Sequence, residues 1–154
     1  MFTLKKILVA TDFSPHSEVA LNYAAEFGKT FQAEIIVATI VEEPSLMAEL
    51  PPMGEAYFPP NLAELQQQTA EKACQKKIEE HGLQNARTVV TIGTPFVEIV
   101  RLAREENVDM IIIGTHGRGA IAHMLLGSVA EKIVRKAPCP VLTVRSGEHE
   151  FIQP

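Results

Sequence analysis

The sequence has few cysteines, and the two that are present lie far apart. Cys74 and Cys139 have no cysteine or histidine near them at a spacing typical of zinc sites. Two cysteines also make no disulfide framework of the kind that small secreted domains need. We therefore expect a reducing environment and predict that the protein is cytoplasmic.

The sequence also lacks an excess of positive charge and any long apolar run. Its 14 Lys and Arg residues against 19 Asp and Glu residues give a formal net charge of −5, which argues against a broad nucleic-acid-binding surface. No apolar run reaches the roughly 18 residues that a transmembrane helix requires. The beginning, "MFTLKKILVATDFS", has no small-residue cleavage site. We expect binding to neither nucleic acid nor membrane, and a protein that stays where it is made.

Five short apolar runs alternate with helix-like segments along the chain. The runs cover residues 6–11, 34–41, 86–92, 108–114 and 140–145, and they are nearly continuously apolar. Such runs are typical of a parallel sheet that is covered by helices on both faces. The length fits one domain. The sequence therefore predicts a single α/β doubly wound domain over residues 1–146, followed by a tail over residues 147–154.

Several helix ends have recognisable signals. Ser14 followed by Pro15 is typical of an N-cap residue with proline at the first helical position. Asn61 with Glu64 is a capping pair, and Gly82 lies where that helix would end. For the last helix, Ser128 and Glu131 have the spacing of a capping box.

The stretch "GTHGRGAIAHMLLGS", residues 114–128, holds four of the nine glycines and directly follows the fourth apolar run. Open parallel sheets bind ligands beyond the carboxyl ends of their strands. Glycines there expose backbone N–H groups, and the next helix begins with its positive dipole end, so an anion such as phosphate is favoured. The nine residues between Gly117 and Gly127 span about 14 Å if helical. Gly114 and Gly127 can therefore serve one ligand only if the chain between them folds back.

Other nucleotide and catalytic signatures do not match. Gly114 and Gly119 have the glycine spacing of a P-loop, but Ala120 and Ile121 follow in place of lysine and serine. No Gly-x-Gly-x-x-Gly fingerprint follows the first run. The third run ends "VVTIG", without the carboxylate of a phosphorelay receiver, and no Ser–His–Asp set can be assigned. We therefore expect a binding protein without dedicated catalytic residues.

Three blocks of sequence, in this order, resemble the universal stress protein family: "KILVATDFS", "GTPFVEIVRLAREENVDMIIIG" and "IIIGTHGRGAIAHMLLGSVAEKIVRKAPCPVLTVR". The nucleotide-binding members carry Gly-x2-Gly-x9-Gly-Ser/Thr after the fourth strand, and the resemblance covers roughly residues 3–146. It implies a five-stranded sheet of order 3-2-1-4-5 and an ATP-binding regulatory role in stress. It further implies Mg²⁺ or Mn²⁺ bound through the phosphates, a homodimer through the fifth strand (140–145), and a protein partner still to be identified.

The resemblance also assigns roles to individual residues. Asp12 would hold the ribose hydroxyls with Ala10 and Thr11 beside it, and Ile40 would line the adenine slot. The residues that would surround the sugar and the phosphates are Gly114, Thr115, His116, Gly117, Arg118, Gly119, Gly127, Ser128, Val129 and Ala130. One departure is Thr39, where many members have histidine.

The residues by themselves leave alternatives open. Asp12 could serve as a turn residue and Ser128 as a helix cap, while Arg118 could face either phosphate or solvent. His116 and His123, seven residues apart, are a poor zinc pattern. Two other functions compete with regulated ATP binding: a dimerisation module that needs no nucleotide, and a slow ATPase.

Overall fold

The computed structural model of the chain describes residues 3–42, 61–116 and 126–146. The expected tail (147–154) and three of the predicted site residues, Gly117, Arg118 and Gly119, lie outside these ranges. The elements, in chain order, are β1 (Lys6–Ala10), α1 (Pro15–Phe31), β2 (Glu34–Val41), α3 (Leu62–Glu80), β3 (Ala86–Ile92), α4 (Pro95–Glu105), β4 (Met110–Gly114), α5 (Ser128–Lys136) and β5 (Val141–Val144).

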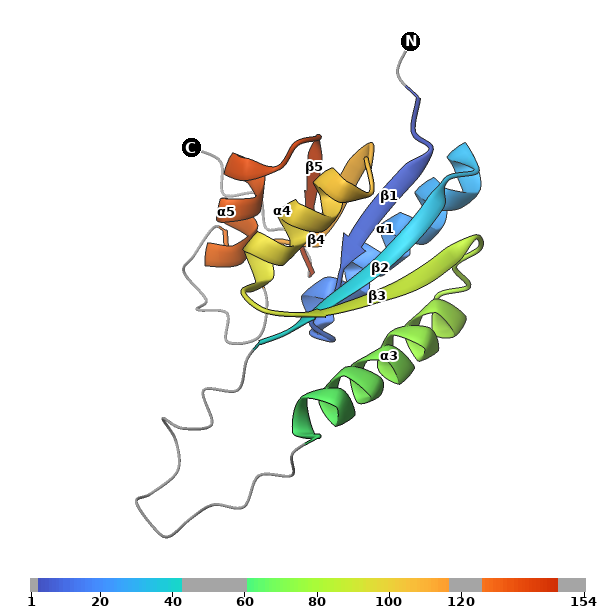
Figure 1. The fold of residues 1–154 in the computed structure, drawn as a ribbon. Helices are drawn as coiled ribbons and strands as arrows, with labels where there is room; N and C mark the ends of the chain where they lie inside the picture. Colours follow the sequence, from blue (N-terminus) through green and yellow to red (C-terminus); the bar gives the residue numbers. More distant parts are fainter. Residues whose placement is uncertain (1–2, 43–60, 117–125, 147–154) are drawn as a thin grey trace, which may run out of the picture.

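The five strands form one parallel sheet, as the apolar runs predict, and its order β3-β2-β1-β4-β5 is the one that the resemblance implies (Figure 1). β1 lies in the middle, because it pairs with β2 on one side and with β4 on the other. The order reverses direction between β1 and β4. In doubly wound folds the crevice at such a reversal is where ligands bind.

Helices cover both faces of the sheet, and this explains why the strands are apolar throughout. Ile7 and Val9 of β1 are fully buried on the face that α1 and α3 cover, whereas Leu8 between them is fully buried on the face of α4 and α5. Burying a side chain of this size stabilises the fold by roughly 1.5–3 kcal/mol. Alternate residues of one strand therefore belong to two separate hydrophobic clusters.

The helix ends follow the sequence signals in part. Ser14 is the N-cap of α1, and its hydroxyl accepts a hydrogen bond from the Ser17 N–H at 3.4 Å. Gly82 follows α3 with a φ of +60°, the left-handed conformation that glycine favours. Asn61 is the N-cap of α3 as predicted, but its side chain makes no capping hydrogen bond.

Within the described ranges, no helix combines the length and the apolar character that crossing a membrane requires.

Candidate functional site

A cleft of about 880 Å³ lies at the carboxyl ends of the strands. Its wall includes every predicted site residue that the structure describes: Ala10, Thr11, Asp12, Ile40, Gly114, Thr115, His116, Gly127, Ser128, Val129 and Ala130. The fold therefore brings together residues that are more than 100 positions apart in the chain. That they bind a nucleotide stays a prediction.

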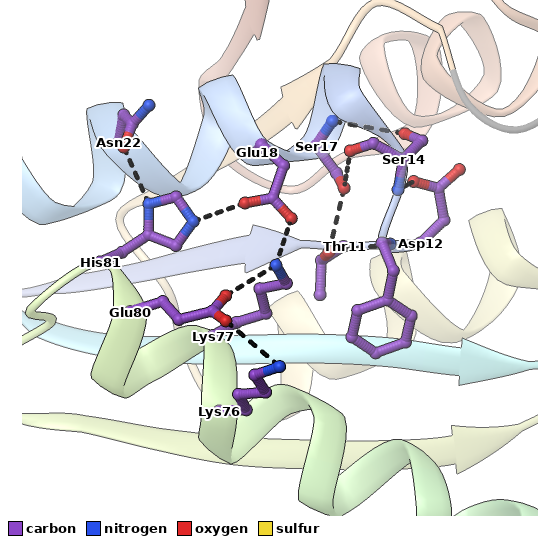
Figure 2. Close-up of polar contacts among 11 residues, drawn as sticks. Thr11, Asp12, Ser14, Ser17, Glu18, Asn22, Lys76, Lys77, Glu80 and His81 are labelled. Atoms are coloured by element: carbon purple, nitrogen blue, oxygen red, sulfur yellow. Dashed lines mark hydrogen bonds and ion pairs between the residues drawn. The ribbon is translucent and has the colours of Figure 1, made fainter.

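The turn between β1 and α1 fixes the position of Asp12. One carboxylate oxygen of Asp12 accepts a hydrogen bond from the Ser14 N–H at 3.0 Å, and Phe13 between them has a φ of +63° (Figure 2). A left-handed conformation is uncommon for a non-glycine residue and costs on the order of 1–3 kcal/mol. Its presence here means that the surrounding hydrogen bonds hold the turn in one shape, with Asp12 in the wall of the cleft.

A series of hydrogen bonds that involve hydroxyl groups stabilises this turn. The Ser17 hydroxyl donates to the Ser14 carbonyl at 2.9 Å, so its oxygen is the acceptor in the 3.0 Å contact with the Thr11 hydroxyl (Figure 2). Thr11 Oγ1 in turn accepts from the Phe13 N–H at 3.1 Å. Thr39, which stands where many family members have histidine, donates its hydroxyl to the Thr11 carbonyl and is buried. Thr39 therefore connects the end of β2 to the end of β1.

The backbone packs closely against Gly114 and Gly127. A Cβ atom on Gly114 would lie 3.0 Å from the backbone carbonyl carbon and oxygen of His16. A Cβ atom on Gly127 would lie 3.1 Å from the Thr115 carbonyl oxygen, which already accepts the Gly127 N–H at 2.6 Å. The second contact places Gly127 directly beside the end of β4, so the chain between the two glycines returns to its starting point, as a shared ligand would require.

The residues of the first turn of α5 line the cleft, and their backbone N–H groups have no acceptor within the helix. Gly127 is the N-cap, it has no capping side chain, and the first intrahelical bond is made by the Glu131 N–H to the Gly127 carbonyl at 2.9 Å. The N–H groups of Ser128, Val129 and Ala130 therefore have no acceptor within the helix. All three residues line the cleft, and the helix dipole adds positive potential at this end.

The capping box predicted for Ser128 and Glu131 is wrong. Ser128 is the first residue of α5 and not its cap, because the contact between Gly127 and Thr115 sets the helix start one residue earlier than the box requires. Glu131 instead pairs with Arg135 at 3.0 Å. Ser128 is exposed and lines the cleft.

The charged side chains of the described cleft wall are acidic. Asp12 and Glu42 belong to the wall, whereas lysine and arginine do not occur among its described residues. His116 lines the cleft with one ring nitrogen 3.1 Å from Thr115 Oγ1, and its ring lies 5.5 Å from that of His16. Within the described ranges no group of three or more metal-ligating side chains exists. The described part of the wall therefore offers an anion backbone donors but no cationic side chain of lysine or arginine.

Sequence reasoning missed the wall that α3 contributes. Gln66, Thr69, Ala70 and Ala73 line the cleft opposite the strand ends. Their spacing of three and four residues marks one helical face, but nothing local in the sequence indicates which strands that face covers. The position of α3 depends on its packing against β2 and β3.

Comparison with known proteins shows to which family the chain belongs. The model of the universal stress protein family matches residues 3–145. This chain belongs to that family. Two universal stress proteins from Methanocaldococcus jannaschii are similar to it: MJ0531 is 36% identical, with 95% of this chain and 85% of the relative covered, and MJ0577 is 32% identical, with 92% and 94% covered.

Solved structures of universal stress proteins share the fold. The structure of MJ0577 has a TM-score of 0.81 at 30% identity, covering 96% of this chain and 99% of that one. A universal stress protein in complex with cAMP has a TM-score of 0.66 at 24% identity, covering 94% and 99%. One from Archaeoglobus fulgidus in complex with dAMP has a TM-score of 0.60 at 21% identity, covering 93% and 98%. These last two likenesses concern the fold alone.

Proposed function

We propose that this universal stress protein binds ATP in the cleft and acts as a nucleotide-responsive regulatory protein in the stress response. The proposal rests on one observation. Because β2, β1 and β4 are neighbours in the sheet, the three groups proposed to contact the nucleotide, at the carboxyl ends of these strands, lie in a row. Ile40 is the next-to-last residue of β2, Asp12 follows β1, and the donors of α5 follow β4. Two strand spacings separate the ends of this row, about 10 Å, a length that an extended nucleotide can cover.

This row of residues offers a chemically suitable group for each part of a nucleotide. The backbone N–H groups of Ser128, Val129 and Ala130, which have no acceptor within the helix, suit phosphate oxygens. The Asp12 carboxylate is an acceptor for ribose hydroxyls, and Ile40 offers an apolar surface to a base. Two solved structures of this fold are complexes with adenine nucleotides, cAMP and dAMP, and they are consistent with a nucleoside phosphate as ligand.

We further propose that Mg²⁺ or Mn²⁺ accompanies the triphosphate. The described cleft wall contains acidic side chains and no lysine or arginine, so these residues offer a triphosphate no cationic side chain, and a metal ion would supply positive charge beside them. The described residues offer no three-ligand metal site, and this fits an ion that is held mainly by the phosphates. When bound, the ion would supply positive charge beside the oxygens that the α5 donors contact.

Dimerisation through residues 140–145 is part of the same proposal. The Thr115 N–H donates to the Val144 carbonyl at 2.8 Å, so the first cleft residue after β4 is bonded to the edge strand β5. A ligand that contacts Thr115 would therefore touch a residue bonded to the edge where a second copy would pair. The protein partner and the cytoplasmic location stay predictions.

Thermal unfolding of the nucleotide-stripped protein tests the proposal. A ligand at about 100 times its dissociation constant adds roughly 2.7 kcal/mol, and for a domain of this size that raises the melting temperature by roughly 5–10 °C. We expect this shift with Mg-ATP. With EDTA and ATP we expect a smaller shift, because the uncompensated phosphates face Asp12 and Glu42.

Ser128→Asp is the variant that separates ligand binding from folding. A carboxylate at the first position of α5 favours the helix through its dipole, by about 0.3–1 kcal/mol, but it repels phosphate. We expect an unchanged or higher melting temperature without nucleotide and loss of the Mg-ATP shift. Gln84→Asp adds the same charge at an exposed position outside the cleft and should keep the shift.

The two competing functions give different results. If the wild-type protein folds but shows no shift at millimolar Mg-ATP, the proposal fails and a nucleotide-independent interaction module takes its place. Steady release of inorganic phosphate that Ser128→Asp abolishes would favour a slow ATPase instead.

A further inference from the structure

A second hollow of the described surface lies away from the cleft, beside α4 and the end of α5. It has a volume of about 820 Å³, and none of its described lining residues belongs to the cleft wall. The two helices pack against each other on one face of the sheet (Figure 1). We call this hollow the α4–α5 groove; residues of α4 between 96 and 105 line it, together with Lys136 of α5.

Apolar side chains of α4 form part of this groove. Val100 is buried and Phe96 is partly buried against the core, whereas Val97 is 44% exposed. An apolar side chain of another molecule that entered the groove would cover Val97 and remove its surface from water. The groove therefore offers a place for one apolar anchor residue.

The charged side chains next to these apolar residues include two lysines that share one aromatic ring. Lys132 and Lys136, one turn apart on α5, hold their ammonium groups 5.0 Å and 5.3 Å from the centre of the Phe96 ring. Each contact of this kind is favourable, but like charges at this spacing along a helix repel each other. An anion beside the ring would relieve that repulsion.

The acidic side chains of α4 do not supply this anion, because they are paired with another residue. Glu98 and Glu105 both bond to Arg101, at 2.5 Å and 2.7 Å. The two lysines and Arg104, which also lines the groove, form no ion pair with any described residue. Three cationic side chains thus adjoin an apolar surface, in a chain whose formal net charge is −5.

This combination of an apolar surface and local positive charge suits a short acidic peptide segment better than other anionic partners. A nucleic acid or a membrane surface extends far beyond the groove and would meet the net negative charge of the rest of the molecule. A peptide segment contacts the groove alone. It can place one apolar side chain against Val97 and hold carboxylates beside the lysines.

We propose that the α4–α5 groove is a docking site for an acidic segment of a partner protein. An apolar anchor residue of that segment contacts Val97, and the carboxylates on either side of it pair with the two lysines and Arg104. The groove lies outside the cleft, so this inference does not depend on nucleotide binding. α5 belongs to both sites, since its first turn lines the cleft and its last residue lines the groove.

Fluorescence titration of the full chain with a synthetic peptide tests this inference. The probe is a short peptide in which one tryptophan stands between two pairs of glutamates. The chain itself contains no tryptophan, so the emission reports on the peptide alone. We expect a saturable blue shift, because the indole ring enters apolar surroundings, and weaker binding as salt is added, because salt screens exposed charges.

The apolar part of the site is tested by Val97→Glu. This variant places a carboxylate on the exposed apolar surface and should abolish the blue shift. Val134→Glu is its matched control, because it makes the same change at a 47% exposed position of α5 that does not line the groove. The control should bind the peptide within about twofold of the wild type, and circular dichroism should show that both variants are folded.

The charged part of the site is tested by the double variant Lys132→Gln with Lys136→Gln. It should weaken peptide binding about three- to tenfold, as expected for the loss of two exposed charge pairs. Lys72→Gln with Lys76→Gln removes two exposed lysines at the same spacing on α3. This control should keep the wild-type affinity within about twofold.

Four results would overturn the inference. The first is no blue shift with the wild type at millimolar peptide, and the second is equal binding of a peptide with lysines in place of its glutamates. The third is binding to vesicles of anionic phospholipid that Val97→Glu abolishes, which would make the groove a membrane contact. The fourth is a dimer, measured by light scattering, that Val97→Glu converts to a monomer, because the groove would then be an interface between two copies of the chain.

Discussion

At the scale of single residues, the glycines of the cleft show how a backbone contact can favour glycine without an unusual dihedral angle. Gly127 has a φ of −67° and a ψ of 154°, values that any residue adopts. The Thr115 carbonyl oxygen is what crowds a side chain there, because it lies 3.1 Å from where a Cβ atom would be. A variant at Gly127 would therefore disturb packing and ligand binding together, whereas Ser128→Asp affects chiefly the ligand.

Gly114→Ala is expected to destabilise the nucleotide-free protein by about 1–3 kcal/mol, the usual cost of overpacking. The new Cβ atom would lie 3.0 Å from the His16 backbone, and backbone atoms cannot move aside as the end of a side chain can. Urea unfolding followed by circular dichroism measures the change. Gly82→Asn is the control, because nothing lies within 4 Å of that position and asparagine tolerates its φ of +60°. Equal stability of Gly114→Ala and wild type would show that the contact has room to relax.

At the scale of secondary-structure elements, most of the fold could be predicted because its signals are local and repeated. Each strand is an apolar run, and Ser14 caps its own helix. The start of α5 could not be predicted, because the contact of Gly127 with Thr115 decides it. The wall containing Gln66 was missed for the same reason: a helix pattern shows which face is buried, but only tertiary packing shows what it covers.

Two helices on one face of the sheet are joined by a polar cluster, Glu18 and Asn22 of α1 with Lys77 and the adjoining His81 of α3 (Figure 2). Glu18 Oε1 lies 2.7 Å from Lys77 Nζ, and Glu18 Oε2 lies 2.6 Å from His81 Nε2. Partial burial of the Glu18 carboxyl opposes ionisation, but the hydrogen bonds from Lys77 and His81 outweigh it and lower its pKa below the usual 4.5. The ionised form of Glu18 is thus favoured in the folded protein.

The lowered pKa of Glu18 predicts how the stability of the protein depends on pH. A carboxyl whose pKa is lowered by folding contributes stability that is fully present above its unfolded pKa and is lost as the pH falls through its folded pKa. We expect the free energy of unfolding of the wild type to fall as the pH drops below about 4.5. The free energy of unfolding of Glu18→Gln should fall less over the same range. At pH 7 the variant should be about 1 kcal/mol less stable.

Denaturant titrations at pH 7 and at several values below 4.5 measure both effects. Glu26→Gln makes the same change on the exposed side of α1 and should follow the wild type at every pH. Identical pH profiles for Glu18→Gln and wild type would mean that the polar cluster between α1 and α3 contributes nothing to the free energy of unfolding.

At the scale of the whole molecule, the proposed dimer depends on which backbone groups of β5 remain unpaired. The carbonyl groups of Pro140 and Val144 accept hydrogen bonds from the Ile111 and Thr115 N–H groups of the β4 side. Because strand residues alternate in direction, the backbone groups of residues 141 and 143 point away from β4, towards the open edge of the sheet. An open edge of this kind is a template for another strand.

Thr143→Pro uses that alternation to test the dimer without breaking the fold. Proline removes the outward N–H of Thr143, and edge strands tolerate proline where the lost N–H faces away from the sheet. We expect light scattering coupled to gel filtration to give twice the chain mass of 16.9 kDa for the wild type and the single mass for the variant, with an unchanged circular dichroism spectrum. Thr143→Val keeps the N–H and should remain a dimer. A monomeric wild type, or a dimeric Thr143→Pro variant, would rule out pairing through β5. If the variant is a folded monomer, its Mg-ATP melting shift then shows whether the cleft needs the second copy, because the Thr115 bond to Val144 lies within one chain and survives the substitution.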